Sequence, residues 1–279
     1  STIQRNAGKI LLLDGNEIAS QASARAACLL TRARTKPALM ELVQETYDCI
    51  KEIEVLLDES LELQQCGSVT IASSDSSLKG LEALEEAATR FGIPNERISR
   101  ECVKELLPWI ESDAVDVALY MPTDAFIDSA LLCSGYARAA AKLGVELKPN
   151  CKVKEIIVEQ DEIRGVSLVN GERLNAPIVV NAAGSWANLL MRPLKVGLPF
   201  TPVRSHFWIT DIDNKRFPAG HPFTVIPDAR AFTRSDVGAL IIGLRESQCQ
   251  AFDPSTMTDK LEDFDFNKAA KWTVLDECA

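Results

Sequence analysis

The stretch Ile178-Val179-Val180-Asn181-Ala182-Ala183-Gly184-Ser185-Trp186 decides how the rest of the chain is interpreted. Its β-branched residues predict a buried strand over 178–181, and small residues then lead into a helix start. Small side chains let a bulky ligand approach the backbone, and a helix N-terminus attracts anions. A plain strand-to-helix turn explains the same residues equally well, so the surrounding sequence has to separate the two interpretations.

A second strand signal lies near the start of the chain. The apolar run 9–13 ends in Asp14-Gly15, which predicts a buried parallel strand followed by an acidic residue. A carboxylate there needs a polar partner, and in dinucleotide-binding folds that partner is a ribose hydroxyl. A turn or helix cap is the alternative for Asp14. The segment 20–27 follows with hydroxyls and Arg25, which suit a diphosphate, whereas a solvated loop is its alternative.

The periodicity of the remaining chain predicts a mixture of helices and strands. Apolar residues at helical spacing predict helices over 37–63, 77–91, 99–107 and 128–143. Alternating or apolar runs predict strands over 67–72, 145–147, 153–159, 163–169, 203–211 and 239–244. Asn170-Gly171 is a hairpin signal. The expected fold class is therefore α/β, or α+β overall.

Composition limits the classes of protein that this chain can belong to. A length of 279 residues favours two domains, and a net charge of −10 argues against a nucleic-acid partner. Eight scattered cysteines without a C-x-x-C pair and only two histidines predict buried, reduced thiols and no metal site. We expect no membrane span and no signal peptide, and a cytoplasmic protein, with the mitochondrial matrix as the alternative. The chain does not begin with Met, so we expect a processed protein or a fragment.

Several segments, taken in order, resemble one family. They are Ile10 to Asp14, Ile18 to Arg25, Pro122-Thr123-Asp124-Ala125-Phe126-Ile127-Asp128, Lys152 to Ile156 with Gly165-Val166 and Gly171, and Ile178 to Trp186. The third resembles the pattern P-x-D-G-x-(V/I)-D, and the last resembles V-V-N-A-A-G-A-W. Together they resemble the FAD-dependent D-amino-acid oxidase superfamily, which includes sarcosine and dimethylglycine dehydrogenases and glycine oxidases. The resemblance extends from about Lys9 to Leu244.

The resemblance implies a two-domain architecture. We expect a Rossmann-like FAD-binding domain from residues 1–36 and 121–195. A substrate domain over 37–120 and 196–279 is expected to be built on a mixed or antiparallel sheet with helices. The family begins with a strand and a G-x-G-x-x-G loop and closes with a C-terminal strand that contacts the flavin. Neither pattern is found in this sequence, so we expect the FAD-binding domain to be incomplete and the chain to be truncated at both ends.

The resemblance also assigns cofactor contacts. Asp14, with Gly15 beside it, matches the acidic ligand of the ribose, and Val153 matches the residue whose backbone meets the adenine. The sarcosine-dehydrogenase-like branch attaches its flavin through a His where this chain has Arg25, so we expect non-covalent FAD. The remaining matches are the loop over the diphosphate and flavin, Ser20, Ser23, Arg25, Ala26 and Ala27, and the later contact, Ala183, Gly184 and Trp186.

The expected reaction is oxidation of the C–N bond of an amino acid or secondary amine, of the sarcosine, glycine or D-amino-acid type. Oxygen or an electron carrier is the expected acceptor. An Arg is needed for a substrate carboxylate, and Arg234 is a candidate. Arg204 and His206 lie on a predicted strand that could face the flavin; a structural role is the alternative for all three. A flavin-free remnant that acts as a non-catalytic binding protein is the alternative function.

Overall fold

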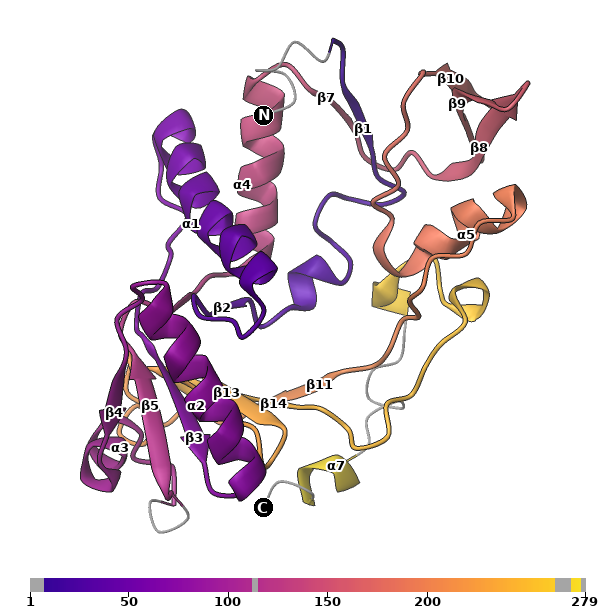
Figure 1. Cartoon of the computed structure of the whole chain (residues 1–279). Coiled ribbons are helices and arrows are strands. Elements are labelled where there is room, and N and C mark those ends of the chain that lie inside the picture. The colour runs from indigo at the N-terminus through magenta and orange to yellow at the C-terminus, as the bar shows by residue number, and fades with distance from the viewer. Residues whose placement is uncertain (1–7, 112–114, 264–271, 277–279) are drawn as a thin grey trace. The chain divides into compact units, whose positions relative to one another are not determined.

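The computed structural model describes residues 8–111, 115–263 and 272–276, and the chain divides into two compact units (Figure 1). The first unit comprises Ser1–Arg25, Cys133–Arg204 and Cys249–Phe266. The second comprises Ala26–Leu132, Ser205–Gln248 and Asn267–Ala279. The assignment of an FAD-binding and a substrate-binding domain to 1–36 with 121–195 and to 37–120 with 196–279 stays a prediction.

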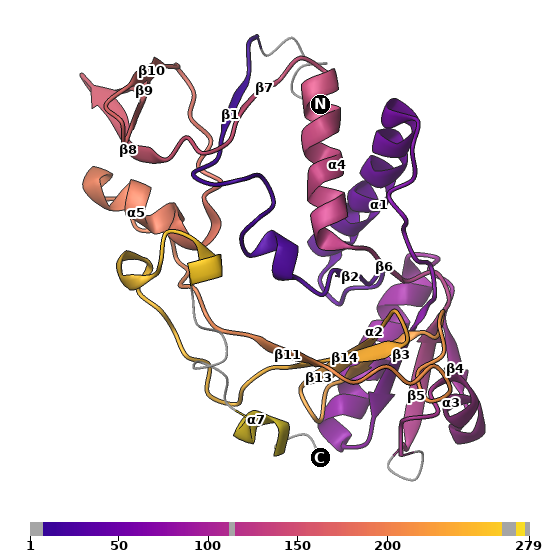
Figure 2. The same ribbon diagram turned by 180° about the vertical axis from the view of Figure 1, so that it is seen from behind.

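The second unit is built on a seven-stranded mixed sheet (Figure 2). Its strand order is β11-β14-β13-β12-β3-β5-β4, and β12 and β3 are the parallel neighbours in it. This mixed sheet confirms the expected fold class. Its strands are β3 (Ser68–Ala72), β4 (Glu96–Ile98), β5 (Val117–Met121), β11 (His206–Ile209), β12 (Phe223–Ile226), β13 (Ala231–Asp236) and β14 (Ala239–Leu244).

Strand β3 is buried on both faces, whereas its alternating sequence predicts a half-buried strand. Helix α2 (Asp75–Arg90) packs on one face through Leu81 and Ala88, which join Leu119 and Met121 in one apolar cluster. Helix α3 (Arg100–Leu106) lies on the other face and contributes Val103 to a second cluster. Two covering layers explain why all five residues of β3 are buried.

Helix α1 (Pro37–Leu57) begins at the proline that the sequence predicts but ends earlier than residue 63. Asp58 adopts a left-handed conformation and its N–H bonds the carbonyl of Glu54, which stops the helix. The hydroxyl of Tyr47 donates to the carbonyl of Leu30, 2.8 Å away, in the short strand β2 (Leu29–Leu30). Strand β2 pairs with β6 (Ala125–Phe126), so α1 is fastened to this small ribbon.

The first unit contains two smaller sheets. Strand β1 (Leu11–Leu13) pairs in parallel with β7 (Glu146–Lys148), which confirms a parallel strand before Asp14, but the predicted burial is wrong because Leu12 is 40% exposed. Strands β8 (Val153–Glu159), β9 (Glu162–Leu168) and β10 (Arg173–Asn175) form an antiparallel sheet, with the expected hairpin at 170–171. The core of this unit is Ile156, Val166 and Leu168, and Leu190 and Met191 of α5 (Ala187–Met191) pack against it.

The other helices are short, apart from α4 (Ser129–Lys142), which matches its predicted span within a residue at each end. Single turns are formed by η1 (Ser23–Arg25), η3 (Gly184–Trp186), η4 (Arg192–Leu194), η5 (Pro254–Thr256), η6 (Leu261–Asp263) and α7 (Thr273–Asp276). No helix in the described ranges is long and apolar enough to cross a membrane. The described cysteines, which leave out Cys278, are free thiols; two are exposed and five are partly exposed, rather than buried.

The predicted strand over 178–181 is wrong. These residues form no strand, and Ile178 and Val180 are 78% and 83% exposed. A strand needs a hydrogen-bonded neighbour, and the described part of the chain supplies none to this segment. The predicted strand 203–211 is likewise shortened to β11, because Val203 pairs with Ala251 in an isolated bridge instead of continuing the sheet.

Candidate active site

Asp14 lies directly after β1, where a turn fixes its carboxylate. Its Oδ1 accepts a hydrogen bond of 2.9 Å from the backbone N–H of Asn16, and its carbonyl accepts one of 2.7 Å from Cys151. Its own N–H donates to the carbonyl of Lys148. Within the described residues, Oδ2 accepts no hydrogen bond. The N–H, the carbonyl and Oδ1 of Asp14 are therefore all hydrogen-bonded, while Oδ2 can accept from a ligand hydroxyl.

Gly15 and Val153 lie close to this turn in the first unit. A Cβ on Gly15 would lie 3.5 Å from the side chain of Lys152, and Val153 is the first residue of β8. Cys151, whose N–H bonds Asp14, joins the two segments. The structure therefore brings together Asp14, Gly15 and Val153, which the resemblance assigns to the ribose and adenine.

Hydrogen bonds to nearby carbonyls hold the segment 20–25 in its conformation. The hydroxyl of Ser20 donates to the carbonyl of Glu17, and Nη1 of Arg25 donates to the carbonyls of Ser20 and Gln21. Ser23 and Arg25 are the ends of η1. Because the Arg25 guanidinium bonds two carbonyls of its own loop through Nη1, it stiffens the loop.

Ala183, Gly184 and Trp186 form a single turn. The N–H of Ala183 donates to Oδ1 of Asn181, and the amide of Asn181 donates to the carbonyl of Ala187. Trp186 closes the turn by donating its N–H to the carbonyl of Ala183. Asn181 thus bridges this turn on both sides and holds the exposed Gly184 in place.

Ala26 and Ala27 belong to the second unit, apart from Ser20 to Arg25. The carbonyl of Ala26 accepts a hydrogen bond of 3.1 Å from the hydroxyl of Ser129 at the start of α4. Their conformation is therefore set by the second unit.

Arg234 lies on β13 with an unusual degree of burial for a cation. Its side chain is 12% exposed, its guanidinium lies 4.8 Å from the centre of the Phe126 ring, and Nη2 is 3.6 Å from Oδ1 of Asp236. Its Nε is buried and has no hydrogen-bond partner among the described residues. A buried donor without a partner is costly, so this position suits an anionic ligand.

His206 lies on the opposite face of the same sheet. In the sheet, His206 lies opposite Leu244, and Leu244 lies opposite Ala231. Arg234 lies opposite Ile241, and Ile241 lies opposite Ile209. Alternation along each strand therefore directs the two side chains to different faces. Nδ1 of His206 is 3.1 Å from Oε1 of Glu246, and both side chains are nearly buried.

Arg204 is not on β11. It belongs to the first unit, and its N–H donates to the carbonyl of Gln250, 3.2 Å away. Arg204 and His206 are therefore not neighbours on one strand, and within the second unit His206 and Arg234 lie on opposite faces of the sheet.

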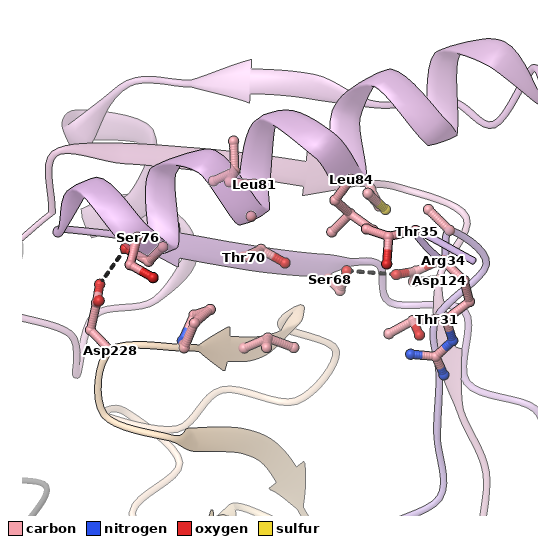
Figure 3. Close-up of a pocket in the computed structure, with 16 residues that line it drawn as sticks. Thr31, Arg34, Thr35, Ser68, Thr70, Ser76, Leu81, Leu84, Asp124 and Asp228 are labelled. Carbon is pink, nitrogen blue, oxygen red and sulfur yellow. Dashed lines mark hydrogen bonds between the residues drawn. The ribbon is translucent and has the colours of Figure 1, made fainter.

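Sequence reasoning missed a cavity of about 400 Å³ inside the second unit (Figure 3). Its floor is Ser68 and Thr70 of β3, and its roof is α2. Hydroxyl side chains separated widely along the sequence could be found only once the fold placed them together. Its lining is Thr31, Ala33, Arg34, Thr35, Ser68, Thr70, Ser76, Ser77, Gly80, Leu81, Leu84, Met121, Asp124, Val225, Pro227 and Asp228.

Comparison with known proteins gives a family model that matches residues 3–273, described as FAD dependent oxidoreductase, or DAO. The chain belongs to this family. It is 25% identical over 265 residues to 4-methylaminobutanoate oxidase (formaldehyde-forming) of Paenarthrobacter nicotinovorans, covering 94% of this chain and 31% of that protein. It is 28% identical over 248 residues to mitochondrial sarcosine dehydrogenase of Mus musculus, covering 85% and 26%. The chain thus spans less than a third of these curated relatives.

Among solved structures, L-proline dehydrogenase from P. horikoshii matches with a TM-score of 0.78 at 20% identity. The match covers 97% of this chain and 75% of that one. It shows a shared fold. The family implies an FAD cofactor, and the Asp14 turn fits the adenosine end of that group because one oxygen of its carboxylate can accept from ribose hydroxyls.

Proposed function

We propose that the protein binds FAD non-covalently and takes part in oxidising the C–N bond of an amino acid or secondary amine. The observation that carries the proposal is the family match over 3–273, together with an acidic turn at the end of a parallel strand. The bound flavin would accept the hydride equivalent, with oxygen or an electron carrier as the final acceptor.

The chain's own residues have separable roles in this proposal. Asp14 holds the ribose, and Gly15 and Val153 shape the adenine end. The turn that ends at Trp186 approaches the cofactor with the small side chains of Ala183 and Gly184. Arg234 binds a substrate carboxylate, supported by its buried Nε without a partner in the described ranges. Arg25 stiffens the loop that follows β1.

Flavin binding by the purified chain tests the proposal. We expect the protein to retain FAD or to take it up from solution, read from visible flavin absorbance and from quenching of flavin fluorescence. Asp14→Asn keeps the size of the side chain but removes its charge. It should weaken FAD binding about tenfold or more, because hydrogen bonds to charged groups contribute about 1.5–3 kcal/mol.

Asp161→Asn is the matched control, since Asp161 lies in the exposed turn between β8 and β9 and Asn tolerates its left-handed conformation. FAD affinity should be unchanged in this variant. A folded, colourless protein that takes up no FAD would contradict the proposal and favour a non-catalytic binding protein instead.

A further inference from the structure

The cavity under α2 has two polar ends and an apolar middle. In Figure 3, Asp228 and Ser76 lie at one end, while Arg34, Thr35 and Thr31 lie at the other. Leu81, Leu84, Met121 and Val225 line the space together with these groups. The roof extends over the residues of α2 from Ser76 to Leu84, a helix length of about 12 Å. A ligand that filled it would be elongated, with a polar group at each end.

The Asp228 end favours a cation. A helix N-terminus alone would attract an anion, but the Asp228 carboxylate already occupies it. Asp228 accepts hydrogen bonds from the N–H of Ser73 and from the hydroxyls of Ser74 and Ser77, at 2.6 to 2.8 Å. These bonds keep the pKa of Asp228 below its ordinary value, so the carboxylate is ionised at neutral pH. A carboxylate oxygen can accept more than one hydrogen bond, so an ammonium group can donate to Oδ1 of Asp228 beside the Ser74 hydroxyl, whereas the carboxylate would repel a second anion.

The Arg34 end favours an anion. Arg34 brings a guanidinium to the lining, and the buried hydroxyl of Thr31 has no hydrogen-bond partner within the described part of the chain. The carboxylate of Asp124 lies beside them; it accepts from the N–H of Arg32 and the hydroxyl of Ser68, and the positive charge of Arg34 opposes its negative charge. A ligand carboxylate could take up the Arg34 and Thr31 donors together.

Two features of the middle indicate a space that is kept open. Thr70 is 8% exposed, and its hydroxyl makes no hydrogen bond among the described residues. Gly80 lies inside α2, where glycine lowers helix stability, yet a Cβ there would meet nothing within 4 Å. Packing against a neighbour therefore does not explain the glycine, which lines the cavity at an exposed position of α2.

We propose that the cavity beneath α2 binds a linear amino carboxylate whose ammonium and carboxylate are separated by an apolar chain. The ammonium lies against Asp228 and the carboxylate against Arg34 and Thr31, with the methylenes along Leu81 and Leu84. The proposal concerns the second unit alone and does not depend on FAD binding.

Binding of 6-aminohexanoate to the purified chain tests the proposal, measured by calorimetry and by the thermal shift that the ligand produces. Hexanoate, hexylamine and glycine are the comparison ligands, because each lacks one charge or the separation between charges. We expect each of them to bind at least about tenfold more weakly, as loss of a charged hydrogen bond predicts. Equal binding of hexanoate or of hexylamine would overturn the proposal, as would no binding of 6-aminohexanoate.

Variants locate the site. Gly80→Leu should abolish binding by filling the cavity, while Ala83→Leu adds the same side chain to an exposed position of α2 and should leave binding unchanged. Arg34→Gln should weaken binding of 6-aminohexanoate about tenfold or more and leave binding of hexylamine unchanged. If Gly80→Leu does not fold, the Arg34→Gln comparison decides. Undiminished binding of 6-aminohexanoate to folded Gly80→Leu or to Arg34→Gln would overturn the assignment.

Discussion

Asp124 is a carboxylate buried in the second unit, where it needs hydrogen-bond donors. Its carboxylate is fully buried; one oxygen accepts a 2.7 Å bond from the Arg32 N–H, and the other accepts one of the same length from the Ser68 hydroxyl. Burial raises the pKa of Asp124, although both bonds and the nearby arginines oppose the rise. Because the folded pKa lies above the unfolded one, this group's contribution to stability is greatest at acid pH. It is lost as pH rises through the folded pKa.

Removing one of these bonds gives a prediction with a defined pH dependence. Ser68→Ala leaves a carboxylate oxygen buried without its donor, so the free energy of unfolding should fall by about 2 kcal/mol at neutral pH. The lost bond favours the charged carboxylate, so the pKa of Asp124 rises further and the deficit should shrink as the group becomes protonated in acid. Urea denaturation at a series of pH values measures both effects.

Thr70→Ala is the control for this experiment, because Thr70 is buried on the same strand but its hydroxyl has no partner in the described ranges. It should show a smaller loss that does not vary with pH. A Ser68→Ala deficit that stayed constant from acid to neutral pH would contradict the role given to the Asp124 charge.

At the scale of one element, Gly80 inside α2 and Gly92 just after it should respond in opposite ways to replacement by alanine. Gly80→Ala should raise the free energy of unfolding by about 1 kcal/mol, because the new methyl meets open space and alanine favours the helix. Gly92, just beyond the C-cap Phe91, has a φ of +67°, so Gly92→Ala should lower stability by about 1 kcal/mol. Thermal or urea unfolding compares them, and a shift of the same sign in both variants would contradict this explanation.

Helices that depend on the spacing of neighbouring apolar residues could be predicted from the sequence. The apolar spacing of α1, α2 and α4 is a property of consecutive residues, so their spans agree with expectation to within a few residues, except where Asp58 ends α1 early. The segment 178–181 has a strand-like composition, but pairing requires a neighbour that no local pattern reveals. Strand β13 was missed because its sequence mixes Thr, Arg and Ser with apolar residues, and β12 because it is only four residues long.

For the whole molecule, the sequence could name candidate residues one by one, but how they are grouped depends on the fold. Asp14, Gly15 and Val153 do come together, because the N–H of Cys151, two residues before β8, bonds the carbonyl of Asp14, directly after β1. Arg204 and His206 are not on one strand, since β11 begins only at His206. Which face of the sheet His206 and Arg234 meet depends on the register across three strands, β11, β14 and β13, and the sequence contains no signal for that.

Arg234 and His206 lie on opposite faces of the seven-stranded sheet, so we expect their substitutions to have different effects in flavin-loaded, active protein. Arg234→Gln should raise KM for an amino-acid substrate about tenfold to a hundredfold with little change in kcat, because it removes a carboxylate contact made in both ground and transition states. KM for the matching amine without a carboxylate should not change. His206→Gln breaks the contact with Glu246 on the other face, so it should lower Tm and leave both KM values unchanged. Steady-state kinetics on the two substrates, with thermal unfolding of each variant, separates these effects. An equal rise in both KM values for Arg234→Gln would mean that the guanidinium supports the sheet and does not bind the carboxylate.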